Sequence, residues 1–131
     1  MTLGELALHV ATIPGSVAQV LSAGDVEAKL LLSHPLSEDL AAIRGSLPGS
    51  VEAARQYVGN APADEMASAW SIRHRGAAAL TVPKAVAVRL LMLNHWYHHR
   101  GQLVVYLRLL DVPVPSVYGP TADENPFATA D

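Results

Sequence analysis

One stretch dominates the chain: residues 94–102 have the sequence NHWYHHRGQ and lie inside an apolar run over residues 85–110. Within that run only Gly101 opposes a helix. Side chains four residues apart on a helix lie above one another, so His95 and His99 project from one face. Two imidazoles at this spacing can bind one metal ion, as in zinc hydrolases with two helical histidines.

The remainder of this helix face is mostly apolar. A metal site on it would be narrow, with Gln102 and Tyr106 as polar groups one and two turns away from the histidines. The residues between the two histidines include no Glu, so the general base of a zinc protease is missing, and with it that mechanism. The other residues on this face are Val88, Leu91 and Met92.

Composition indicates one globular domain. The chain has 131 residues, enough for a core of its own, and 50% hydrophobic against 16% charged residues exclude a disordered chain. A net charge of −3 gives no electrostatic basis for binding nucleic acid. The sequence contains no cysteine, which excludes disulfides, thiolate ligands and a cysteine nucleophile. Any sulfur chemistry therefore has to come from a substrate.

An uncharged stretch near the N-terminus, residues 6–24, is long enough to suggest a membrane span. Its polar and helix-breaking residues, such as His9 and Pro14, make spanning unfavourable. A secretory signal would need a basic start, where this chain has Glu5. We therefore expect a soluble, cytoplasmic protein without a membrane partner.

Helical periodicity predicts a single domain over residues 1–131, with helices over about residues 2–23, 37–58 and 83–110 and an extended tail over 111–131. The first helix should begin at a capping box formed by Thr2 and Glu5. Pro14 should kink this helix without ending it. Its apolar stripe includes His9, which should therefore face inward.

The middle of the chain is less regular. Start signals at residues 35–39 open the second helix, Pro48 and Gly49 interrupt it, residues 50–58 continue or restart it, and residues 59–62 stop it. Short helical turns are also expected over residues 27–32 and 66–70, and an irregular or extended segment over 73–82. The buried side of the second helix is expected to comprise Leu36, Leu40, Ile43 and Leu47.

The last helix carries a second apolar side, formed by Leu90, Leu93, Tyr97 and Val104. A helix at the surface of a protein has one apolar stripe, so this helix should be buried on more than one side. Three substantial helices cannot supply that cover. We therefore expect a further helix, either from a partner chain in a homodimer or from sequence upstream of Met1.

A catalytic metal site needs a third protein ligand and an open position. His9 is the best candidate, because it lies on the inward stripe of another helix. His98 is turned by about 60° around the helix from His95, which places it at the edge of the site. His34 and His74 lie in loop-like contexts and should face solvent.

Several motifs in the chain match a known pattern. They are residues 3–9 (LGELALH) with 13–15 (IPG), then 94–95 (NH) with 98–103 (HHRGQL), 106–108 (YLR), 112–115 (VPVP) and 118–124 (YGPTADE). With these motifs the sequence resembles the DinB (damage-inducible), or YfiT-like, family of small metal-binding helical proteins. The motifs cover both ends of the chain.

The resemblance implies an all-α fold, an up-down four-helix bundle that binds a divalent ion through one histidine on the second helix and two on the last. By motif these are His9, His95 and His99, the same three that the spacing selects. The ion would be zinc or nickel, or alternatively iron or manganese. In the family a complete helix precedes the stretch that here begins at Met1, so this chain looks short by the family's first helix.

The resemblance also implies an activity, because members with an assigned one are mostly metal-dependent transferases of thiols such as bacillithiol, mycothiol or glutathione. The partners would be a small-molecule thiol and an electrophile. An ion on three neutral imidazoles keeps its charge and an open position, so it can bind a thiolate. Gln102 or Tyr106 would orient the substrate, and His98 would support the ligands or carry a proton. Metal-assisted hydrolysis and a non-catalytic metal-binding or partner-binding bundle are the alternatives.

Overall fold

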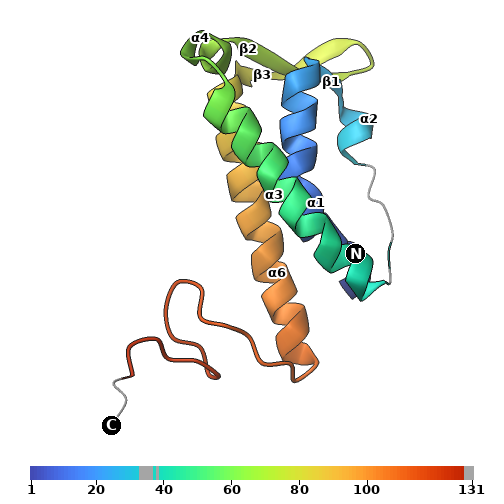
Figure 1. Cartoon of the computed structure of the whole chain (residues 1–131). Helices are drawn as coiled ribbons and strands as arrows, with labels where there is room; N and C mark the ends of the chain where they lie inside the picture. The colour runs from blue at the N-terminus through green and yellow to red at the C-terminus, as the bar shows by residue number, and fades with distance from the viewer. Residues whose placement is uncertain (33–36, 38, 129–131) are drawn as a thin grey trace.

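Three long helices dominate the computed structural model, which describes residues 1–32, 37 and 39–128 (Figure 1). They are α1 (Leu3–Ala23), α3 (Leu40–Asn60) and the closing helix, our name for the continuous run of α5 (Lys84–Ala87), η1 (Val88–Asn94) and α6 (His95–Leu109). α1 packs on both of the others. The described residues contain no fourth long helix, so a four-helix bundle is not formed by this part of the chain alone.

α1 begins at the capping box that the sequence predicts. The Thr2 hydroxyl accepts from the Glu5 backbone N–H at 3.3 Å, and the Glu5 carboxylate accepts from the Thr2 N–H. Pro14 lies inside the helix, which continues beyond it. Among the described helices, α1 is the one that is long and apolar enough to cross a membrane, a property of its length and composition alone.

α3 is continuous where an interruption is expected. It begins at Leu40 and runs unbroken through Pro48, so the predicted break there is wrong. Directly after the proline, the Ser50 hydroxyl accepts from the Gly15 N–H at 2.8 Å and donates to the Thr12 carbonyl at 3.1 Å. These bonds fasten α3 to α1 beside Pro48, so packing on α1 holds the helix although the proline removes the donor for the Arg44 carbonyl.

The outer side of α3 is exposed. Leu40 and Leu47, expected in the core, expose 58% and 39% of their surface. Ala54 is the buried residue of this helix. α3 packs mainly on α1, so the described residues leave much of its apolar stripe uncovered. Leu36 and His34 lie outside the described residues.

The closing helix contains an irregularity that the sequence does not predict. Val88–Asn94 forms a π-helix, with wider turns than an α-helix, and it ends directly before His95. Met92 in this segment is buried, whereas Leu90 and Tyr97 on the second apolar side are exposed. The described residues therefore leave the second apolar side of this helix partly uncovered, and the expected further helix is not among them.

The described chain is mostly helical, as expected, but a small sheet covers one end of the helices, so the fold is not all-α (Figure 1). β1 (Val26–Glu27) pairs parallel with β2 (Ala69–His74), and β2 pairs antiparallel with β3 (Ala77–Pro83). The segment 73–82 forms the larger part of the β2–β3 hairpin. Arg75 and Gly76 form its loop with positive φ angles of 51° and 81°, as tight two-residue hairpin loops require. The short helices are α2 (Ala28–Leu31) and α4 (Ala63–Ala67).

The core lies where the sheet meets the helices. Trp70 of β2 is 1% exposed and packs with Leu21, Val26 and Ala87. Its indole N–H donates to the Gly24 carbonyl at 2.6 Å. This cluster fixes α1 against the closing helix near the sheet, and the candidate site lies further along the same two helices.

Candidate metal centre

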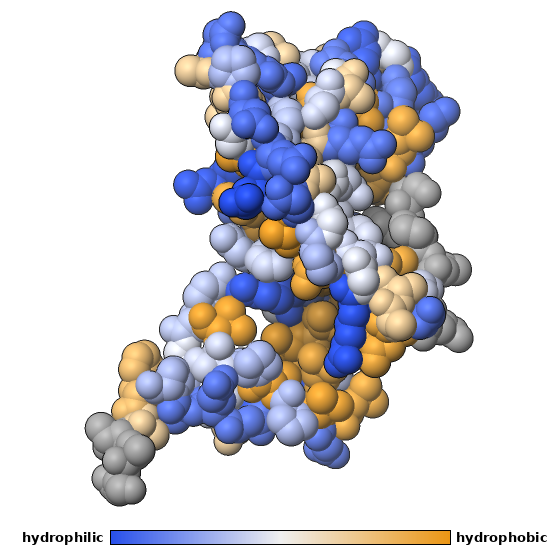
Figure 2. Space-filling view, viewed as in Figure 1, coloured by the Kyte–Doolittle hydropathy of each residue, from blue (hydrophilic) through white to orange (hydrophobic). Residues whose placement is uncertain are grey.

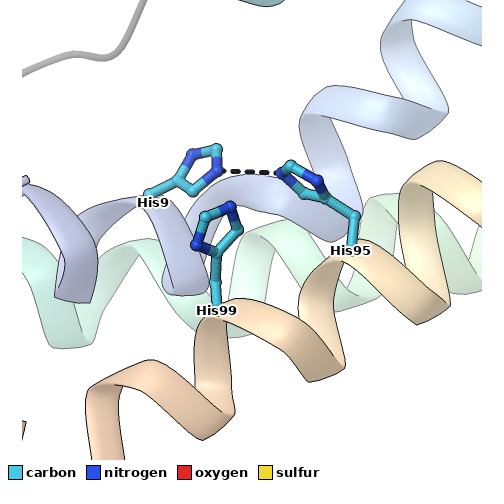
Figure 3. A group of neighbouring side chains, drawn as sticks. All are labelled: His9, His95 and His99. Carbon is cyan, nitrogen blue, oxygen red and sulfur yellow. Dashed lines mark hydrogen bonds between the residues drawn. The ribbon is translucent and has the colours of Figure 1, made fainter.

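Three histidines from two helices meet between α1 and the closing helix (Figure 3). His9 comes from α1, and His95 and His99 come from the first two turns of α6. Their ligand nitrogens all lie within 4.8 Å of one another, and the Nε2 atoms of His9 and His95 are 3.1 Å apart. The rings make interplanar angles of 86°, 77° and 75°. The structure thus brings together the three residues that the sequence selects.

The cluster fits a divalent ion. Two nitrogens bound at about 2.1 Å to a tetrahedral ion lie roughly 3.4 Å apart, close to the 3.1 Å between His9 and His95. Imidazole nitrogen suits zinc, nickel, copper or iron, whereas magnesium and calcium prefer oxygen ligands. Three protein ligands would also leave a coordination position open, as in catalytic zinc sites. These residues could therefore hold a metal ion.

Gln102 orients one of the histidines. Its side-chain oxygen lies 2.7 Å from Nδ1 of His99. A protonated Nδ1 donates to this oxygen, which leaves Nε2 of His99 unprotonated and able to bind an ion. The sequence suggests Gln102 as a group that orients substrate; its contact in the structure is to a candidate ligand.

Trp96 joins the two histidine-bearing helices at the site. Pro14 has no N–H, so the Val10 carbonyl one turn earlier lacks its helical donor. The indole N–H of Trp96 donates to this carbonyl at 2.8 Å. Val10 follows His9 in the sequence and Trp96 follows His95, so the bond lies next to both candidate ligands. Sequence reasoning misses Trp96. The signal for it is the proline in α1, which leaves a carbonyl that another element has to satisfy.

The remaining candidates lie around the cluster. The Tyr106 hydroxyl donates to the Met1 carbonyl at 2.9 Å, which ties the closing helix to the start of the chain. His98 is exposed, and its ring centroid lies 4.9 Å from that of His99. His74 is exposed at the end of β2, as predicted.

Cavities open on both sides of the cluster. One, of about 250 Å³, lies between α1, α2 and the closing helix and has His9 and His95 in its wall. The other, of about 300 Å³, is lined by His99, Gln102 and Tyr106 together with the start of the chain. α1 and the closing helix are antiparallel, so the two cavities follow one another along this helix pair with the histidines between them.

A comparison with protein families supports the resemblance that the motifs indicate. The model of the DinB family matches residues 1–126, which include both histidine-bearing helices. Searches of curated proteins and of solved structures found no match. The family match extends over nearly the whole chain and includes all three clustered histidines. The chain belongs to the DinB family.

Proposed function

We propose that this protein is a metal-dependent enzyme that transfers a low-molecular-weight thiol to an electrophilic small molecule. The observation that carries the proposal is the convergence of three imidazoles within 4.8 Å, with a cavity on either side. Membership of the DinB family agrees with it. The absence of cysteine agrees as well, because a sulfur nucleophile would have to come from a substrate.

The residues of the chain would hold the ion and orient the reactants. His9, His95 and His99 would bind it, with zinc or nickel as the first expectation and iron or manganese as alternatives. A bound divalent ion supplies positive charge and an open position, which favour a thiolate over a thiol. Gln102 keeps Nε2 of His99 available. Together with Tyr106, it presents polar groups to the cavity on that side.

The proposed reaction needs no reactant other than the thiol and the electrophile. The thiol loses its proton, its sulfur forms a bond to the electrophilic carbon, and the leaving group departs with the electron pair of the bond that breaks. His98 is exposed beside His99 and can pass the proton to solvent.

The test measures metal content and turnover on the same preparations. Elemental analysis gives the metal content, and conjugation of monochlorobimane to bacillithiol, mycothiol and glutathione gives the activity, with and without a chelator. His95→Ala should lose both metal and conjugation, whereas His74→Ala, at an exposed histidine distant in sequence from the cluster, should lose neither. Bound metal without conjugation would support a non-catalytic bundle, and a metal-free protein would reject the site.

We also propose that the protein is a homodimer. Apolar side chains are exposed on the outer sides of α3 and the closing helix, among them Leu47, Val51 and Leu90. Figure 2 shows apolar surface gathered in the lower half of the molecule in this view. Such patches mark interfaces, and a symmetric dimer covers the same patch on both copies.

Light scattering after size-exclusion chromatography tests the dimer. The wild type should have twice the chain mass of 13.9 kDa. Leu47→Glu and Leu90→Glu, one on each helix, should shift the mass to that of a single chain. A wild-type mass of one chain would reject the dimer.

A further inference from the structure

The cavity beside His9 and His95 is lined mostly by aliphatic side chains. It measures about 250 Å³ and lies between α1, α2 and the closing helix. Ile13 and Val17 of α1 and Leu91 of the closing helix line it, and α2 adds two leucines. The cavity therefore combines an apolar wall with two of the candidate metal ligands at one end.

The polar groups of this cavity are few and neutral. Apart from the two histidines, none of its described lining residues is titratable, and the hydroxyls of Thr12 and Ser16 are its other polar side-chain groups. Thr12 Oγ1 donates to the Leu8 carbonyl at 2.9 Å, so it offers a ligand only its lone pairs. In the metal-free protein, a charged group placed here would lose its hydration without gaining an ionic partner among the described lining residues, which is strongly unfavourable.

The volume restricts the ligand further. An apolar cavity of about 150 Å³ takes up benzene, so the 250 Å³ found here accommodates a ring with a short substituent or a branched alkyl group. Glutathione, with two carboxylates and an ammonium group, would bring charges into an uncharged wall. The cavity therefore suits the electrophile rather than the thiol.

The cavity on the other side of the histidines carries a different set of polar groups. It measures about 300 Å³ and reaches His99, with the amide of Gln102 and the hydroxyl of Tyr106 in its wall. Met1 also lines it, so the start of the chain lies next to these polar groups. A polar co-substrate could form hydrogen bonds there. The two cavities thus differ in the polar groups that they place near the histidines: hydroxyls on the α2 side, and an amide and a phenol on the other.

We propose that the cavity at α2 is the acceptor subsite, and that it binds an uncharged electrophile through a monocyclic aryl or short alkyl group, with the reactive carbon next to His9 and His95. The reaction rests on the proposed function, whereas ligand binding in the cavity requires neither metal nor thiol. Benzyl chloride represents this class. With it, sulfur bonds to the benzylic carbon, chloride leaves with the bonding electron pair, and the thiol proton passes to solvent.

Binding is tested first without turnover. Toluene is titrated into protein with ¹³C-labelled methyl groups, both metal-free and zinc-loaded, and followed by NMR. Toluene should shift the methyl signals of Ile13, Val17 and Leu91 in both forms, whereas benzoate, with a ring of the same size and a negative charge, should leave those of the metal-free form unchanged. Ser16→Phe, at an exposed position in the cavity wall, should weaken toluene binding at least tenfold. Val105→Phe, in the wall of the other cavity, should not.

Turnover supplies a second readout. The ratio kcat/KM for benzyl chloride should exceed that for 4-(chloromethyl)benzoate at least tenfold, and Ser16→Phe should reduce this preference. Toluene binding without metal or turnover would support the subsite and reject the proposed function. Metal binding and turnover in a protein whose cavity methyls do not respond to toluene, or whose metal-free form responds equally to benzoate, would overturn the subsite. If Ser16→Phe fails to fold, the methyl chemical-shift changes of the wild type with toluene and benzoate test the subsite on their own.

Discussion

Gln102 determines which nitrogen of His99 faces the other two histidines, because its oxygen lies 2.7 Å from Nδ1. Gln102→Leu keeps the size of the side chain and removes the acceptor, so Nε2 of His99 is no longer held toward the ion. We expect zinc affinity to fall about 10- to 100-fold, the usual effect of losing such a supporting contact. Competition with a chromophoric chelator measures this change. Gln19→Leu, at an exposed amide of α1, is the matched control. Equal affinity in both variants would show that Gln102 does not position a ligand.

At the same scale, the sequence predicts the histidine cluster but not the contact that aligns it. His95 and His99 are one helical turn apart wherever the helix forms, and His9 lies on the apolar stripe of its own helix, so local patterns select all three. The bond from Trp96 to the Val10 carbonyl depends on the rotation of α1 relative to the closing helix. Local periodicity does not encode that rotation.

At the scale of the elements, the crossing of α1 and α3 depends on Gly15. A Cβ at this position would lie 2.9 Å from Cα of Ser50, a backbone atom that cannot move without its helix. Gly15→Ala should therefore separate the helices and lower the free energy of unfolding by about 1–3 kcal/mol. Gly45→Ala, in open space on α3, should raise it by about 0.5–1 kcal/mol. Urea unfolding followed by circular dichroism measures both, and effects of the same sign would contradict the close crossing.

The tail after the closing helix is anchored by Asp123. Its carboxylate accepts from the Val114 N–H at 2.9 Å and pairs with Arg108 at 2.6 Å. The Val114 bond, and then Arg108, hold the pKa of Asp123 below its usual value. The pKa of Asp123 is lower in the folded than in the unfolded protein. The carboxylate therefore contributes its full stabilisation of the tail above the unfolded pKa of about 3.9, and this stabilisation is lost as the pH falls through the folded pKa. Val114 amide exchange, measured by NMR, should therefore stay protected down to about pH 4 and lose protection below it.

Substitution separates this anchor from general acid unfolding. Asp123→Ala should expose the Val114 amide already at pH 7, whereas Asp64→Ala, at an exposed carboxylate of α4, should behave like the wild type. A protected Val114 amide in Asp123→Ala would mean that other contacts hold the tail.

The elements that the sequence predicts poorly are those without a clear period. The β2–β3 hairpin has a register irregularity between Ile72 and Arg73, which breaks the alternation of buried and exposed residues. β3 also begins with three alanines, which have little strand preference. The usable signal is the two-residue loop at Gly76, whose positive φ suits a hairpin. The predicted burial of Leu40 and Leu47 is wrong for another reason. An apolar stripe predicts that a helix face can be buried, but not that a neighbouring element is present to cover it.

At the scale of the whole molecule, the histidine cluster connects the beginning of the chain to its end. His9 and His95 are 86 residues apart and lie on different helices. An ion bound by both helices would act as a crosslink between them. The Trp70 core fixes the same two helices near the sheet, so the crosslink would add a second point of attachment further along them.

Metal removal should therefore lower thermal stability. An ion at a concentration of about 100 times its Kd stabilises the folded state by about 2.7 kcal/mol. The unfolded chain has no cysteine, so its six histidines are the main competing ligands and reduce this stabilisation only in part. For a chain of 131 residues, we expect the Tm in calorimetry to be roughly 10 °C higher in the zinc-loaded than in the chelator-treated protein. His9→Ala retains the pair on α6 but breaks the crosslink, so zinc should leave its Tm nearly unchanged. An equal rise in His9→Ala would show that the ion binds without joining α1 to the closing helix.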